Sequence, residues 1–324
     1  MNTAQLIAIL STAITTATPL VFACVGETIT ERAGVINLSA EGTIMMAAMV
    51  GFATAKLTGS LWLGFLAAAA TGALFALILA FGSITLKGSQ IAIGFVLSLL
   101  GADLSSFLGN PFVRIPGPTV PSFPVPILQD IPLLGALFFR GDLLVYTSYL
   151  LIAGSWYFLY CTRPGLMLRA LGEQPAAAFA RGTNVILWRY IYTLLGGSLL
   201  GIAGAAFSLD FKAGWSHRHT AGYGWIALAI VIFGGWNPLR AALGTYLFGI
   251  LQSFAGVAQA TIRTVPTQVF TVAPFVLMIL VLVLTSGEWW EYGLRGIPPR
   301  LRRWIQRTMR ATPPAALGQV FEQD

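Results

Sequence analysis

The sequence predicts an all-α, polytopic membrane helical bundle, and the composition and the lengths of its apolar runs carry that prediction. Hydrophobic residues make up 56% of the 324 residues and charged residues only 10%, whereas globular domains carry about 25% charged residues. The apolar residues fall in long runs, many of them close to the roughly 20 residues that a helix needs to cross a hydrocarbon core. This pattern excludes a soluble enzyme and a disordered chain, and it lacks the short alternating strands of a membrane β-barrel.

Nine apolar runs are expected to span the membrane. The first run lacks a basic leading region and a convincing cleavage site, so it is expected to be a retained helix rather than a signal peptide. One later run is short and the second is rich in glycine, so either can be re-entrant, and a count of eight to ten spans stays open. The expected spans are 6–25, 35–55, 61–82, 90–108, 143–161, 190–209, 222–235, 241–260 and 269–285.

The distribution of lysine and arginine predicts the orientation. Cytoplasmic loops carry an excess of these residues, and with nine crossings 13 of the 19 basic residues fall on the side of the C-terminus. We therefore expect a transmembrane domain over 1–286 with its N-terminus outside, followed by a basic cytoplasmic tail over 287–324. The same asymmetry accounts for the net charge of +7, so nucleic-acid binding is not predicted.

The segment 109–142, on the expected outer face, contains seven prolines. Each proline removes a backbone donor and fixes φ, so the segment is not expected to form a long helix. Such backbone must lie outside the hydrocarbon or be covered by protein. Two interpretations stay open, a stiff connector and a docking surface for an external partner.

The loop at 162–189, on the expected cytoplasmic face, is predicted to contain a short helix. Gly172 is expected to break a preceding helical stretch, and Glu173 stands just before Pro175, which suits a first helical turn. Alanines dominate 176–180 and favour helix, and Gly182 with Asn184 supplies the stop. Because the alanine face offers lipid little apolar area, we favour contact with another protein over a connector lying on the headgroups.

Polar and small residues open the second run, namely Asn37, Ser39, Glu41 and Gly42. A carboxylate at mid-bilayer costs about 2.5–3.5 kcal/mol, so Glu41 is expected near an interface, in the bundle interior or beside a polar partner. Irregular backbone at membrane depth is tolerated only where it lines a cavity or is buried in protein. A broken second helix lining a pathway fits both conditions, and the alternative places Glu41 at the cytoplasmic boundary.

No catalytic or metal-binding set is predicted. The two cysteines fall in or beside apolar runs without a CxxC spacing, and the two histidines lie in an expected outer loop. Asp103 and Asp210 lie near the outer ends of spans, where capping is the expected role. The sequence contains neither HExxH nor the GxxxxGK[ST] of a nucleotide-binding loop. Gly196, Gly197 and Gly201 share one run with alanines, which predicts close helix packing.

Three segments resemble, in order along the chain, blocks of the permease subunits of ATP-binding-cassette (ABC) importers. They read ERAGVINLSAEG at 31–42, PGLMLRALGEQPAAAFARGTNV at 164–185 and AGYGWIALAIVIFGGWNP at 221–238. The subfamily takes up simple sugars and nucleosides and has branched-chain amino acid relatives. Gln174 departs from the asparagine of many members, and Arg181 and Thr183 also differ, which pairing with a particular ATPase would explain.

The resemblance implies that 172–182 is a coupling helix that inserts into a groove of a separate ATPase. That ATPase would bind the ATP, so no cofactor is expected in this chain. The resemblance also places Asn37, Ser39, Glu41 and Gly42 near the translocation pathway. The residues that it implies for ATPase coupling are Gly172, Glu173, Pro175, Ala177, Ala178 and Gly182.

The resemblance further implies a bacterial inner-membrane permease that works beside a second permease and an extracytoplasmic solute-binding protein. The short N-terminal region favours a related second permease, with a homodimer as the alternative. The expected function is passage of a nucleoside or simple-sugar-like solute, and the alternative function is an ion-coupled secondary carrier. Because the binding protein supplies most of the selectivity, the sequence leaves the solute itself open.

Overall fold

The computed structural model describes residues 3–131, 134–262, 264–286 and 312–322, and within them the chain is all-helical apart from connecting loops. A single bridge between Ser122 and Asp142 is the only β pairing in those ranges. The predicted fold class is therefore confirmed. The basic residues of the expected tail, at 295–310, lie outside the described residues.

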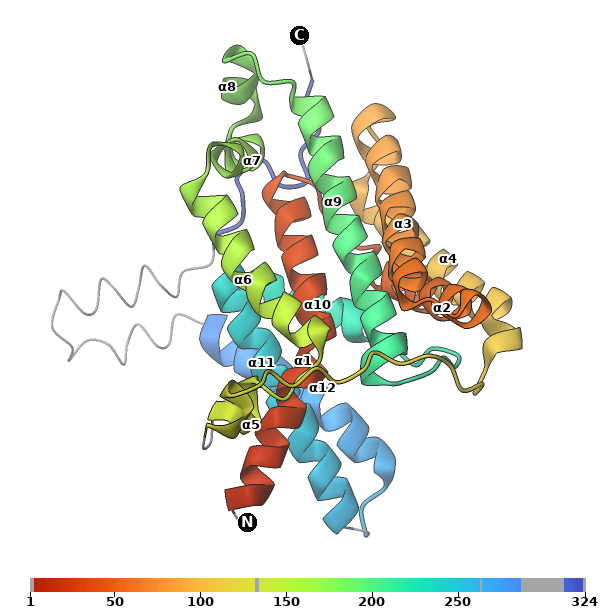
Figure 1. The fold of residues 1–324 in the computed structure, drawn as a ribbon. Coiled ribbons are helices and arrows are strands. Elements are labelled where there is room, and N and C mark those ends of the chain that lie inside the picture. Colours follow the sequence, from red (N-terminus) through yellow and green to blue (C-terminus); the bar gives the residue numbers. More distant parts are fainter. Residues whose placement is uncertain (1–2, 132–133, 263, 287–311, 323–324) are drawn as a thin grey trace, which may run out of the picture.

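Each of the nine expected runs coincides with a helix (Figure 1). Six helical stretches of the described chain are long and apolar enough to cross a membrane, and α10 and α12 are shorter apolar helices. The principal helices are α1 Thr3–Arg32, α2 Ala40–Thr58, α3 Leu61–Ala80, α4 Gln90–Gly109, α6 Leu143–Cys161, α9 Val185–Ala206, α10 Tyr223–Phe233, α11 Pro238–Thr261 and α12 Thr267–Ser286. Two π-helical turns, η1 Phe81–Thr85 and η4 Phe207–Phe211, extend α3 and α9.

The first two spans have different limits from those expected. Helix α1 continues past residue 25 to Arg32, and α2 begins only at Ala40 and runs without interruption. No glycine or proline occurs between residue 27 and Arg32, and the first breaker is Gly34, whose φ is +93°. The irregular backbone therefore lies before the second helix, at 33–39, and not within it. We call 33–39 the α1–α2 junction.

Helix α9 lies in the middle of the bundle, against α1, α2 and α3. Its glycines permit this packing, as the sequence predicts. A Cβ atom added to Gly72 of α3 would lie 2.0 Å from the carbonyl oxygen of Gly197, and one added to Gly26 of α1 would lie 2.6 Å from that of Gly196. The backbones of these helices touch because no side chain separates them.

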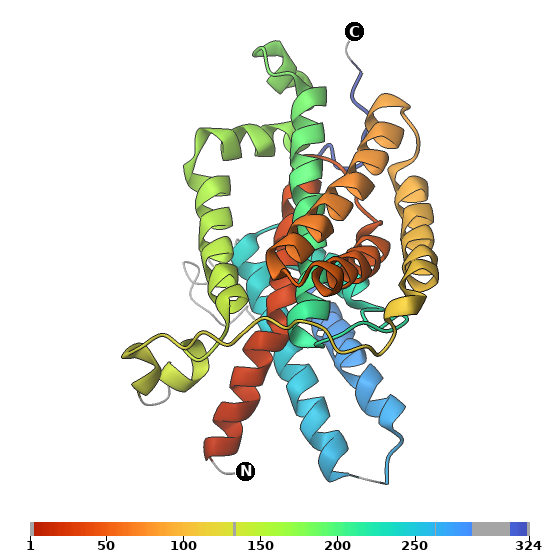
Figure 2. The same cartoon turned by 45° about the vertical axis from the view of Figure 1, so that its right-hand side comes forward.

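The two ends of the bundle carry different structures. At one end, which we call the α8 end, α7 Arg163–Glu173 leads into α8 Pro175–Ala180, and residues 312–322 lie alongside. Figure 2 shows α7 lying across this end, between α6 and α9. The opposite end, the α5 end, carries η2 Asn110–Phe112, η3 Leu128–Asp130, α5 Leu134–Phe138 and the loop before α10.

The described part of the proline-rich segment forms no long helix, as predicted, and contains η2, η3 and the short α5 between irregular stretches. It runs along the helix ends. The Val120 amide donates to the carbonyl of Leu209 at 2.9 Å, and the Arg114 amide donates to that of Trp215 at 3.0 Å. These contacts fit the stiff connector, while a role in docking stays a prediction.

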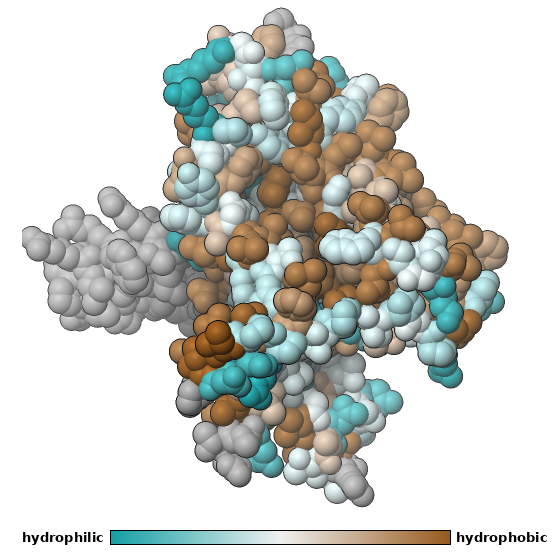
Figure 3. All heavy atoms as spheres, in the orientation of Figure 1, coloured by the Kyte–Doolittle hydropathy of each residue, from teal (hydrophilic) through white to brown (hydrophobic). Residues whose placement is uncertain are grey.

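Large apolar side chains gather on the outside of α3 and α4. Trp62, Leu66, Val96 and Phe107 are among those that are well exposed. Figure 3 shows the apolar surface over the side where α3 lies, with hydrophilic side chains gathered at the two ends. A surface of this kind suits lipid or a second membrane subunit.

Candidate functional site

The loop at 162–189 contains two helices, α7 and α8, that meet at Gln174. Gly172 does not break the first of them, because α7 continues through Gly172 and Glu173. The break comes at Gln174, with φ −146° and ψ 77°, since a residue before proline is disfavoured from helical conformation. Glu173 therefore belongs to the last turn of α7, and the expectation that it opens the next helix was wrong.

The short helix predicted in this loop is α8, Pro175–Ala180. Gly182 ends it as predicted, with φ +84° and its amide donating to the Phe179 carbonyl at 2.8 Å. Asn184 does not contribute to the stop. Its side chain instead accepts from the Leu187 amide at 3.0 Å and caps the start of α9.

Helix α8 offers a small, exposed face. Ala178 is its one buried residue and packs toward α7 and α9, whereas Ala177 and its alanine neighbours are exposed. The Phe179 ring is partly exposed at one edge of this face. A short helix with alanine outward lets another backbone approach closely, which supports the predicted protein contact.

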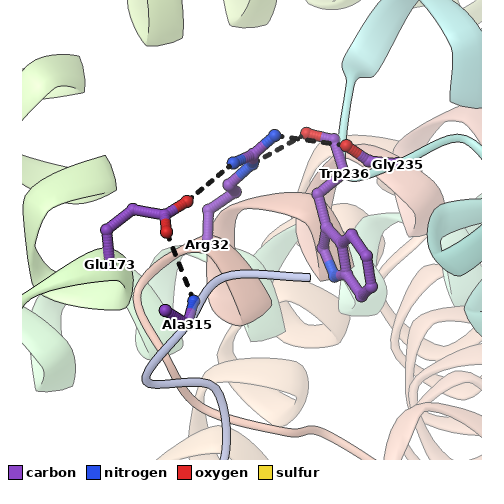
Figure 4. A network of polar contacts seen from close by, with 5 residues as sticks. All are labelled: Arg32, Glu173, Gly235, Trp236 and Ala315. Carbon is purple, nitrogen blue, oxygen red and sulfur yellow. Dashed lines mark hydrogen bonds and ion pairs between the residues drawn. The ribbon is translucent and has the colours of Figure 1, made fainter. Parts of the chain in front are cut away.

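Glu173 points back toward the bundle and forms part of a polar network at the α8 end (Figure 4). Its carboxylate pairs with the Arg32 guanidinium at 3.6 Å and accepts from the Ala315 amide at 3.3 Å. Arg32 also donates to the carbonyls of Trp236 at 3.0 Å and Gly235 at 3.2 Å. The network therefore joins α7 to the end of α1 and to the turn between α10 and α11.

The predicted pathway residues Asn37 and Ser39 lie in the α1–α2 junction and are fully buried. The Asn37 side chain donates to Glu27 of α1 at 2.7 Å, and its oxygen accepts from the Ser39 amide at 3.1 Å and hydroxyl at 2.5 Å. These bonds hold the irregular backbone in protein, the condition that membrane depth imposes.

Glu41 lies in the first turn of α2 and is only 6% exposed. Its carboxylate accepts backbone N–H groups at the start of α10, from Gly222 at 2.5 Å, Gly224 at 2.8 Å and Trp225 at 3.4 Å. A helix N-terminus presents free donors and partial positive charge, so it suits a carboxylate. The expected interior position and polar partner are confirmed, while its depth relative to the cytoplasmic boundary stays a prediction.

Gly42, the fourth predicted pathway residue, marks a close approach between α2 and α4. A Cβ atom there would lie 2.4 Å from the carbonyl oxygen of Ser98, and the Gly42 amide donates to the Ser98 hydroxyl at 3.3 Å. The structure thus brings all four predicted residues together around the junction and gives each a packing or hydrogen-bonding partner. Their place in the pathway stays a prediction.

Sequence reasoning missed several members of this network. Glu27 and Glu31 are buried on α1, and Glu31 accepts from the indole N–H of Trp236. Gln90 accepts from the Ile36 amide at 2.7 Å. The glutamates are four residues apart, the spacing of neighbours on one helix face. Extending the first helix to Arg32 would have found them.

The α5 end contains a hollow of about 560 Å³, lined in part by Arg114, Lys212, Trp215 and His219. The Lys212 ammonium donates to the carbonyl of His219. Burial, and secondarily the charge of Lys212, lowers the pKa of His219 to about 4. His219 is therefore neutral at physiological pH, and it is more enclosed than the expected exposed loop histidine.

Comparison with known proteins identifies the family to which this architecture belongs. Residues 9–282 match the permease component of branched-chain amino acid transport systems. The chain belongs to this permease family. The resemblance carried by the three sequence segments is thereby confirmed, and the protein is a multi-pass membrane permease of the ABC transporter class. Permease components of such transporters are generally non-catalytic.

Named relatives of the permease come from bacteria and an archaeon. A nucleoside ABC transporter permease of Lactococcus lactis is 35% identical over 89% of this chain and 94% of its own length. A guanosine ABC transporter permease of Bacillus subtilis is 33% identical over 92% and 98%. A Haloferax volcanii protein is 40% identical over 76% of each chain, and its name describes it provisionally as a glucose ABC transporter permease.

Proposed function

We propose that the permease forms the translocation pathway of an ATP-driven importer for a nucleoside or simple-sugar-like solute. It would lie in a bacterial inner membrane with the α8 end in the cytoplasm. A separate ABC ATPase subunit would bind and hydrolyse ATP, so the permease itself needs no cofactor. The relatives named for nucleoside, guanosine and glucose transport support this solute class.

The observation that carries the proposal is the placement of α8. This helix projects at the tip of α7 with its alanine face outward, and α7 lies across the end of the bundle. An ATPase that grips α8 would move α7 as a lever. Gly172, Glu173 and Pro175 would fix the position of α8 relative to α7. Ala177 would contact the ATPase. Ala178 and Gly182 would fix the packing and the end of α8.

The polar network gives this movement a route into the bundle. From Glu173 it reaches Arg32 at the end of α1, and from there the turn after α10. Glu41 joins the start of α10 to α2. A shift of α7 would therefore act on α1, α2 and α10 together. Asn37 is bonded to α1, and Glu41 of α2 is bonded to the start of α10, while Gly42 of α2 packs against α4. Packed helices that shift between discrete arrangements are a common basis of alternating states.

The remaining partners follow from the transporter class. The proposed importer includes a second permease, favoured as a related chain with a second copy as the alternative, and an extracytoplasmic solute-binding protein at the α5 end. The apolar surface of α3 and α4 would face lipid or that second permease.

Reconstituted vesicles test this function. With the ATPase, the second permease and the binding protein present, ATP inside the vesicles should drive uptake of labelled guanosine or glucose. The permease alone with a proton or sodium gradient should give no uptake. Gradient-driven uptake by the permease alone would support the ion-coupled carrier and overturn the proposal.

A variant of α8 tests the contact itself. Ala177→Trp should block ATPase binding and reduce ATP-driven uptake without reducing membrane insertion. Leu166→Trp is the matched control, because Leu166 is an exposed apolar residue of the same loop on α7. Equal loss of uptake in both variants would show that the effect is not specific to α8.

A further inference from the structure

Residues 312–322, which we call the strap, close the corner between α7, the α1–α2 junction and the start of α9. The strap lies beside these elements at the α8 end (Figure 1). The Ala316 amide donates to the Gly172 carbonyl at 2.8 Å, and the Gly318 amide donates to the Gly34 carbonyl at 3.0 Å. Two strap residues that are two positions apart are thereby hydrogen-bonded to α7 and to the α1–α2 junction.

The strap completes the C-terminal end of α7. The last carbonyls of a helix lack partners within it. Here the Leu171 carbonyl accepts from the Arg189 guanidinium at 3.3 Å, while Arg189 also donates to the Gln319 carbonyl at 3.0 Å. Arg189 is 2% exposed. Its positive charge at a helix C-terminus is favourable, and the strap helps to orient it.

Side chains along the strap extend the contact in both directions. Phe321 packs edge-on against Phe179 of α8, with ring centroids 5.8 Å apart. Glu322 pairs with Lys87 at 2.6 Å. Ala316 is 4% exposed. A Cβ atom on Gly172 would lie 2.2 Å from the Arg32 carbonyl oxygen and 3.2 Å from Pro314 Cβ, so the absence of a side chain there allows α7, α1 and the strap to meet.

We propose that the strap is a positioning element for coupling. It holds α7 rigidly on the α1–α2 junction, so that displacement of α8 is transmitted into the bundle and is not lost in a loose loop. Without it, the direct polar link between α7 and α1 among the described residues is the Glu173–Arg32 pair. The arginine side chain is 13% exposed but the glutamate is 48% exposed, and solvent at the glutamate weakens such a pair. This inference rests on the proposed function.

The first test measures the mobility of α8 without requiring transport. A spin label on Ala177→Cys, with the two native cysteines replaced, reports the motion of α8 in the purified full-length permease. Ala316→Asp places a charge in the buried contact and should increase label mobility. Val320→Asp is the matched control, because it makes the same charge change in the same segment at a side chain that is 44% exposed.

The second test measures coupling in the reconstituted importer. Mutations on coupling routes change coupling by about 0.5–2 kcal/mol, or roughly 2- to 30-fold. Ala316→Asp should lower solute transported per ATP within this range while the hydrolysis rate of the isolated ATPase stays unchanged. A chain that ends at Ala311, just before the strap, should behave likewise, which guards against a misfolded substitution variant.

Three results separate the possibilities. Unchanged label mobility and unchanged coupling in both strap variants would overturn the proposal. Greater uptake after truncation would also overturn it, because the strap would then be an inhibitor. If the unmodified importer transports nothing, the proposed function fails, whereas the mobility measurement still decides whether the strap positions α8.

Discussion

Glu41 illustrates how individual residues make a buried polar junction stable. Three backbone N–H groups at the start of α10 donate to its carboxylate. Asn37 is likewise bonded to Glu27 and Ser39. At membrane depth an unpaired polar group is costly, because no water replaces a missing partner. Such residues therefore depend on one another, because replacing one leaves its hydrogen-bonding partners unsatisfied.

Replacing Glu41 tests this dependence. Glu41→Leu leaves three donors without an acceptor, and leaving a buried polar group unsatisfied costs about 1–3 kcal/mol. We expect a lower thermal unfolding midpoint in detergent and lower uptake in vesicles. Glu41→Gln keeps an acceptor oxygen and should lose less stability. Wild-type stability in the leucine variant would contradict the assigned role, while a stable glutamine variant with poor uptake would indicate direct action in the pathway.

His219 at the α5 end is expected to make the stability of the fold depend on pH. Its pKa is about 4 in the folded protein against an ordinary value of 6.5, because burial and Lys212 disfavour the charged ring. The unfolded chain therefore takes up the proton first. The contribution of neutral His219 to the free energy of unfolding is therefore fully present above about pH 6.5 and is lost as the pH falls toward 4.

The comparison with His219→Gln isolates this effect. Between pH 7 and pH 4 the wild type should lose about 1–3 kcal/mol more stability than the variant, which cannot titrate at this position. Chemical unfolding of both proteins at a series of pH values measures the difference. Parallel pH curves would show that burial of His219 does not contribute.

At the scale of elements, the bundle depends on helices that touch without side chains between them. Glycines of α3 and α9 face one another, and Gly42 of α2 lies against α4. Close contacts of this kind fix the relative position of helices, because interiors are packed to crystal-like density. In the proposed mechanism, movement of α1 or α7 would therefore be passed on to neighbouring helices.

Gly72→Ala should disturb this packing. The new methyl would lie 2.0 Å from a backbone oxygen of α9, so the helices must separate, at about 1–3 kcal/mol for an overpacked core. Gly154→Ala on α6 is the control, since its Cβ meets nothing within 4 Å. There alanine should stabilise the helix by about 0.5–1 kcal/mol. Equal unfolding midpoints for the two variants would argue against tight α3–α9 contact.

At the scale of the whole molecule, the two ends differ in structure. The α8 end holds the loop at 162–189, the strap and the Arg32 network, and the α5 end holds the proline-rich segment and the 560 Å³ hollow. Because Lys and Arg favour the cytoplasmic side, this arrangement predicts one orientation for every residue at each end.

Cysteine labelling in intact cells tests the orientation. Cys161 is exposed and must first be replaced. A membrane-impermeant thiol reagent should then label Phe123→Cys in the outer segment and leave Ala177→Cys in α8 unlabelled until the cells are opened. Both side chains are exposed in the structure, so access depends on the side of the membrane. Labelling of Ala177→Cys from outside would reverse the topology and remove α8 from the ATPase.

Much of the architecture is predictable from local pattern alone. Long apolar runs locate the helices, glycine-rich stretches mark close packing, and Pro175, the alanines and Gly182 locate α8. The limits of α1 and α7 were missed for a physical reason. The first span was ended where the apolar run stops before Glu27, and the helix before α8 was ended at Gly172. Glu27, Glu31 and Glu173 nevertheless continue their helices, because tertiary partners stabilise them.

The sequence by itself determined that the protein is a helical membrane permease, because apolar length, basic-residue bias and family segments are local properties of the chain. Only the tertiary structure decided that Glu41 caps α10, that Arg32 joins α7 to the α10–α11 turn, and that the strap completes α7. Glu41 and Gly222 are 181 positions apart along the chain. Local periodicity carries no record of such a pairing, since packing of the whole bundle brings the two residues together.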